Sequence, residues 1–100
     1  MRPSANADDW PFQDPRNVAV FTTRAILELG QPVLLVAHDD DDGSWQFHTG
    51  EPEPAEKDGR IVGLAEMIEI DRTLVEVADL PLGWQAYRDW PGGAWRRSPS

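Results

Sequence analysis

Residues 33–48 read VLLVAHDDDDGSWQFH, and this stretch decides the predicted fold. Its first part, Val33–Ala37, is apolar at every position, which is typical of a central strand covered on both faces. Its last part, residues 45–48, alternates apolar and polar side chains, as a strand with one buried face does. Because a polar loop containing Gly43 separates the two runs, the segment predicts a β-hairpin.

The segment before the hairpin predicts a strand followed by a short helix. Residues 18–21 form a β-branched and aromatic run, which favours a strand. Thr22 or Thr23 can then cap a helix, because a hydroxyl side chain can accept a hydrogen bond from a free amide of the first turn. Gly30 supplies the left-handed residue that commonly ends such a helix.

The segment after the hairpin predicts one more strand and two short helices. Residues 60–63 can return to the sheet as a third strand, and the spacing of apolar positions in residues 64–68 predicts a helix. Asp71 is a suitable N-cap for a second helix. Residues 83–88 fit either a helical turn or an edge strand, and the sequence leaves both open.

Together these elements predict a single domain over residues 1–100, a length typical of one compact unit. We expect loose termini at residues 1–16 and 91–100, with Trp10 and Phe12 pinned to the body. The predicted fold class is α+β, with a small, mostly antiparallel sheet and two or three short helices packed on it.

Composition and charge exclude several classes of function. Eighteen acidic residues against nine Lys and Arg give a formal charge of −9, which argues against nucleic acids and anionic membranes as partners. The absence of cysteine excludes disulfides, thiolate metal sites and cysteine nucleophiles. The longest apolar run, Val33–Ala37, is much shorter than a membrane span, and the N-terminus lacks a signal-peptide pattern. We therefore expect a cytoplasmic protein.

The predicted hairpin ends in four candidate binding residues: Asp39, Asp40, Asp41 and Asp42. They lie in a segment from Glu28 to Asp58 that holds nine acidic residues and one lysine, so we expect a protein partner with a basic surface. Clustered carboxylates can also bind Ca²⁺, but a calcium-loop alignment places His38 and Thr49 at its first and last positions, where acids are needed. We therefore expect a solvated turn without a metal.

His38 and His48 flank this turn, and their relation depends on the register of the strands. On one face, with an aspartate nearby, they could bind Zn²⁺; otherwise they are surface histidines. The alternative function is therefore a metal- or small-ligand-binding protein that uses this hairpin region. Ser44 and His48 would stand about 13 Å apart on an extended strand, so they cannot form a catalytic pair. No catalytic motif is present, and we predict no enzyme activity and no cofactor.

Five tryptophans in 100 residues is a high number. Trp45 and Trp84 lie in patterned segments and are expected in the core. Trp90 and Trp95 flank a Pro-Gly-Gly break near several arginines, and they are either binding anchors or a cover for the small core. A homodimer through the hairpin edge or through Trp90 and Trp95 is a further option.

Residues 18–88 resemble a group of small bacterial domains that includes the domain of unknown function 2185. The resemblance rests on these motifs: Phe21-Thr22-Thr23, Gly30, Gly43-x-Trp45-x-Phe47 after an acidic turn, Gly50-Glu51, and Leu80-Pro81-x-Gly83. Members of that family look like immunity proteins of polymorphic toxin systems. The resemblance implies a compact α+β fold and toxin-neutralising binding in a bacterium, and it carries over no catalytic residue.

Overall fold

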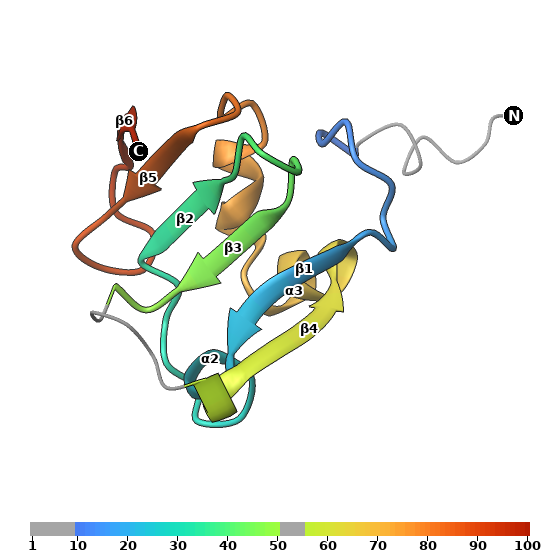
Figure 1. The fold of residues 1–100 in the computed structure, drawn as a ribbon. Coiled ribbons are helices and arrows are strands. Elements are labelled where there is room, and N and C mark those ends of the chain that lie inside the picture. The colour runs from blue at the N-terminus through green and yellow to red at the C-terminus, as the bar shows by residue number, and fades with distance from the viewer. Residues whose placement is uncertain (1–9, 51–55) are drawn as a thin grey trace, which may run out of the picture.

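The computed structural model describes residues 10–50 and 56–100, which form a six-stranded mixed sheet with short helices (Figure 1). The strands lie in the order β4-β1-β3-β2-β5-β6. Their bounds are β1 Ala19–Thr23, β2 Leu35–His38, β3 Trp45–His48, β4 Gly59–Gly63, β5 Trp84–Tyr87 and β6 Arg96–Pro99. The helical elements are α2 Arg24–Leu27, η1 Glu56–Asp58, α3 Leu64–Ile70 and η2 Arg72–Val77, where η marks a 3₁₀-helix. The predicted α+β class is confirmed.

The predicted hairpin is formed by β2 and β3, which pair antiparallel with Leu35 opposite His48. The Asp39 amide donates to the Ser44 carbonyl at 2.9 Å and so closes the connecting loop. Gly43 has a φ of 75°, a left-handed conformation that glycine adopts without a steric penalty. The sheet is mixed because β1 lies parallel beside β3, whereas the other neighbouring strands are antiparallel.

Strand alternation gives this sheet two different faces. The covered face packs on α3 and η2, which lie behind the sheet in Figure 1. Its buried apolar side chains are Val20, Val36, Trp45, Phe47 and Ala86 from the strands, and Leu64, Met67, Leu74 and Val77 from the helices. The expectation that Val33–Ala37 is covered on both faces is wrong, because Leu35 and Ala37 are only half-buried on the opposite face. Strand β2 is central in the sheet, but α3 and η2 cover only one of its faces.

A buried arginine, Arg88, links three segments on the covered face through hydrogen bonds. Arg88 is 2% exposed, and its Nε and Nη2 donate to the Val33 carbonyl at 3.1 and 3.0 Å. Its Nη2 also donates to Asp71 Oδ2 at 2.6 Å, and its Nη1 donates to Thr73 Oγ1 at 2.8 Å. The Trp95 ring lies 4.2 Å from the guanidinium carbon. This network joins β5, the segment before β2, and the start of η2.

Asp71 shows how the network balances its charges. Burial alone would raise the pKa of this carboxyl, but hydrogen bonds from Thr73 and Arg88 outweigh burial and lower it. The Thr73 amide donates to Asp71 Oδ1 at 2.9 Å, which is the predicted N-cap of the second helix. Asp71 is therefore both a helix cap and the partner of a buried cation.

The C-terminal region corrects two expectations. Of the two alternatives for residues 83–88, the strand is confirmed as β5, but its expected edge position is wrong, because β5 lies inside the sheet between β2 and β6. The expected loose tail at residues 91–100 instead contains β6, which pairs with β5 and forms one edge of the sheet.

At the N-terminus, residues 1–9 lie outside the described residues. Phe12 is buried, and its ring makes an edge contact with Trp45 at 5.3 Å between centroids. Trp10 packs against Phe12 at 5.3 Å and donates from Nε1 to the Asp14 carbonyl. The two aromatic residues are thus held on the covered face, as the sequence predicts. Within the described part of the chain, no helix combines the length and apolar character that a membrane crossing requires.

Candidate binding surface

The acidic tip, as we call residues Asp39–Asp42, forms the end of the β2–β3 hairpin. One carboxylate oxygen from each of Asp39, Asp41 and Asp42 lies within 4.8 Å of the others, and Asp41 and Asp42 are exposed. The Ser44 amide and hydroxyl donate to Asp42 Oδ1 at 3.0 and 2.8 Å. These hydrogen bonds lower the pKa of Asp42, so its carboxylate is ionised at neutral pH.

No basic side chain of the described residues neutralises the acidic tip. The five ion pairs found within residues 10–50 and 56–100 all involve other carboxylates. Asp40 is exposed and lies beside Gly83, where a Cβ atom would stand 3.3 Å from Asp40 Oδ2. The acidic tip therefore presents a concentrated negative charge to solvent.

The strand register places the two histidines on opposite faces of the sheet. The sequence had left open whether they share one face. His38 pairs with Trp45 on the covered face, where the two rings stack at 3.8 Å between centroids and His38 Nδ1 lies 2.8 Å from the Leu80 carbonyl oxygen. His48 points to the other face, because it pairs with Leu35. A metal site shared by both histidines is therefore wrong. The Ser44 hydroxyl bonds to aspartates and not to His48, so it forms no catalytic pair.

The side of the sheet opposite α3 and η2 carries a surface that we call the open face. Two rows of side chains run across it, as the strand registers show. The first row is Ile61, Phe21, Gln46, Ala37, Gln85 and Ser98, and the second is His48, Leu35, Tyr87 and Arg96. None of these ten residues is acidic, although the chain holds eighteen acidic residues. Ile61 is 66% and Tyr87 41% exposed, so apolar surface reaches solvent there.

A chain of hydrogen bonds links the open face to the acidic tip. Gln46 Nε2 donates to Asp39 Oδ2 at 2.6 Å, which leaves Gln46 Oε1 to accept from His48 Nε2 at 2.9 Å. The Phe21 ring lies 5.6 Å from the His48 ring. Burial lowers the pKa of His48, and the nearby Asp39 charge opposes this shift without cancelling it. His48 is therefore neutral at pH 7, and the centre of the open face carries no charge.

The two candidate tryptophans have different environments. Trp90 is 61% exposed at the turn between β5 and β6, where the Gly93 amide donates to its carbonyl. Trp95 packs against the core and over Arg88. Of the two, Trp90 is the one that presents a large apolar surface to solvent. Trp45 is buried in the core, and Trp84 packs partly buried against it.

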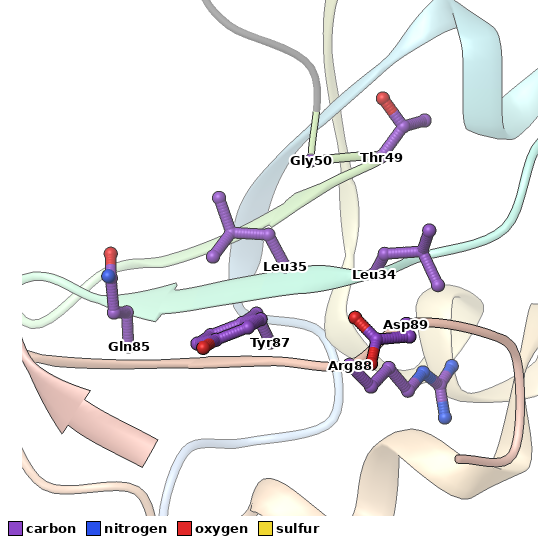
Figure 2. A pocket seen from close by; sticks show the side chains of 8 residues that line it. All are labelled: Leu34, Leu35, Thr49, Gly50, Gln85, Tyr87, Arg88 and Asp89. Carbon is purple, nitrogen blue, oxygen red and sulfur yellow. The ribbon is translucent and has the colours of Figure 1, made fainter. Parts of the chain in front are cut away.

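The sequence pattern did not identify the open face as a surface. Its residues come from all six strands, so the surface exists only once the strand order is known. The sequence of β5 does show the alternation of a strand with one exposed face, because Gln85 and Tyr87 flank the apolar Ala86. The same residues also fit a helical turn. The depression beside Leu35 and Tyr87 was missed for the same reason (Figure 2).

No family model, no curated protein and no solved structure matches this chain. The resemblance to the domain of unknown function 2185 therefore stays an expectation from sequence motifs.

Proposed function

We propose that this chain is a non-enzymatic protein-binding module whose partner has a basic surface. The observation that carries the proposal is the arrangement of charge: the ten residues of the open face include no acid, and beside them lie acidic-tip carboxylates that form no ion pair with any of the described residues. Interfaces are depleted of charged residues at their centre and enriched in aromatic residues, as the open face is. Carboxylates at the border favour a partner that carries lysine or arginine around a neutral centre.

The open face is smaller than a typical protein interface, so a partner has to contact the neighbouring surface as well. Six strands spaced about 4.8 Å apart, with two rows of side chains, cover on the order of 300 Å². A stable protein complex buries about 800 Å² on each partner. A partner that reaches this area has to extend over the neighbouring surface, and the acidic tip adjoins the open face through Asp39 and Gln46. A second copy of this chain would bring another charge of −9 to the same place, which favours a basic partner over a homodimer.

The resemblance to the domain of unknown function 2185 extends the proposal to the kind of partner. A toxin held by this surface would make the chain an immunity-type inhibitor in a bacterial cell. Inhibition by binding requires no catalytic residue on the inhibitor.

The proposal is tested with two synthetic peptides that share their apolar residues but carry either arginine and lysine or glutamate at all charged positions. We expect the basic peptide to shift the NMR amide signals of the acidic tip and the open face, with an affinity that falls as salt rises. The acidic peptide should cause no saturable shift. No shift by the basic peptide would refute the proposal.

A matched pair of variants locates the contact. Asp40 and Asp41 do not hold Ser44 or Gln46, so D40N/D41N removes charge without disturbing those contacts. We expect this variant to bind the basic peptide about fivefold more weakly. E69Q/E76Q removes the same charge from two exposed residues on α3 and η2 and should bind as the parent does. An equal loss in both variants would show that only net charge matters.

The alternative, an ion-binding role for the acidic tip, makes a different prediction. Calcium bound by Asp39, Asp41 and Asp42 would raise the melting temperature by mass action. The protein-binding proposal predicts no such rise at millimolar calcium.

A further inference from the structure

A depression of about 400 Å³ lies at the end of the open face that is remote from the acidic tip (Figure 2). It is lined by Leu34, Leu35, Thr49, Gly50, Gln85, Tyr87, Arg88 and Asp89. Leu35 and Tyr87 are cross-strand neighbours and form an apolar floor. The Arg88 side chain points away from Leu35 in Figure 2, toward the buried network on the covered face. Asp89 is therefore the charged side chain that is available to a ligand in this depression.

An arginine of the chain itself already lies at the edge of this depression. The β5–β6 register places Arg96 opposite Tyr87, and its guanidinium carbon lies 4.8 Å from the Tyr87 ring centroid. Arg96 Nη2 donates to Asp89 Oδ2 at 2.6 Å. The side chains of Arg96 and Asp89 are 55% and 60% exposed, so a competing group can reach both.

This arrangement matches the chemistry of a guanidinium group. A planar guanidinium stacks on an aromatic face and forms directional hydrogen bonds to a carboxylate, and its aliphatic stem packs on apolar surface. Tyr87, Asp89 and Leu35 supply these three elements within the depression. A compact ammonium group would use the carboxylate but would gain less from the ring, and an uncharged apolar side chain would not use Asp89.

We infer that this depression binds an arginine side chain of the partner, and that Arg96 occupies part of the same site in the free protein. The inference rests on the proposed function, because it takes the partner to be basic. The inference adds a specific binding site for one arginine of the partner, at the end of the open face remote from the acidic tip. The partner's arginine would displace Arg96 from Tyr87 or share the Asp89 carboxylate with it.

The test uses N-acetyl-arginine methylamide as the probe, with its citrulline counterpart as the uncharged isostere. Titration of the ¹⁵N-labelled protein should give saturable shifts at Leu34, Leu35 and Tyr87 with the arginine probe and much weaker shifts with citrulline. R96A should bind the arginine probe about two- to fivefold more tightly, because it vacates the ring and the carboxylate. D89N should bind it more weakly by a similar factor.

R97A is the matched control for charge. Arg97 is the neighbour of Arg96 in β6, but it bonds to Asp79 and to the Glu76 carbonyl on the other side of the sheet. R97A should therefore leave the affinity for the arginine probe unchanged. If R97A raised the affinity for the arginine probe as much as R96A does, net charge and not the vacated site would control binding.

Two outcomes would overturn the inference: equal binding of arginine and citrulline, or no gain of affinity in R96A. N-acetyl-arginine methylamide is too small to reach from the depression to the acidic tip. If this probe does not bind, the separate test of the acidic tip with the basic peptide is therefore unaffected. Conversely, arginine binding without any effect of the basic peptide on the acidic tip would refute the proposed function and retain the guanidinium site.

Discussion

The covered face and the open face belong to the same six strands, yet they satisfy their polar groups in different ways. On the covered face Arg88 is buried, and protein atoms accept its hydrogen bonds. On the open face Gln46 and His48 are partly buried and Arg96 is exposed, and these side chains bond to one another or to aspartates at the border. The difference indicates that the covered face holds the fold together, whereas the open face is free to contact another molecule.

The largest effect should come from removing the buried cation. R88M leaves the Val33 carbonyl and the Asp71 carboxylate without their partner in a buried site, so we expect a loss of about 3–5 kcal/mol in the free energy of unfolding. Urea denaturation followed by tryptophan fluorescence measures it. R72M, at an exposed arginine, should change stability by less than about 0.5 kcal/mol. Similar losses in the two variants would contradict the contrast between the faces.

The next largest effect should be the difference in unfolding free energy between truncating an apolar side chain on the covered face and replacing one on the open face. Leu74 is fully buried under the covered face, and L74A should cost about 2–5 kcal/mol because it leaves a cavity. Ile61 lies on the open face and is 66% exposed, so I61T, which keeps the β-branched shape, should cost less than about 0.5 kcal/mol. Thermal and urea unfolding of both variants test this prediction. A large loss in I61T would mean that the open face also contributes to the core.

The smallest effect should be a pH dependence that originates on the open face. Burial lowers the pKa of His48 in the folded protein below the unfolded value of about 6.5. The unfolded chain therefore binds a proton more readily, so this contribution to stability is complete above pH 6.5, falls as pH decreases, and levels off below the folded pKa. The difference in melting temperature between the parent and H48Q, measured from pH 8 to 5, isolates it. An unchanged slope in H48Q would assign the pH dependence to other groups.

Local patterns predicted the elements whose partners are near in sequence. The β2–β3 hairpin was predictable because β-branched and alternating residues flank an Asp-Gly turn. The cap at Asp71 was predictable because its carboxylate serves an amide two residues away. For β5 the local pattern was insufficient, since four residues of mixed polarity fit both a helical turn and a strand.

The candidate surface was predictable only in part. The acidic tip followed directly from four consecutive aspartates in a predicted turn. The open face did not, because its ten residues come from six strands that lie far apart in the sequence. The contacts of Arg96 with Tyr87 and Asp89 also depend on β6, which pairs in a region where the composition suggested a loose tail.

The sequence by itself determined the charge of the chain, the hairpin, the acidic turn and the Asp71 cap, because each depends on residues within a few positions of one another. The tertiary structure alone decided that β1 lies parallel beside β3, that His38 and His48 face opposite sides, and that Arg88 is buried. The physical reason is that alternation fixes which residues share a face of one strand. Which strands become neighbours depends on packing energies summed over the whole chain.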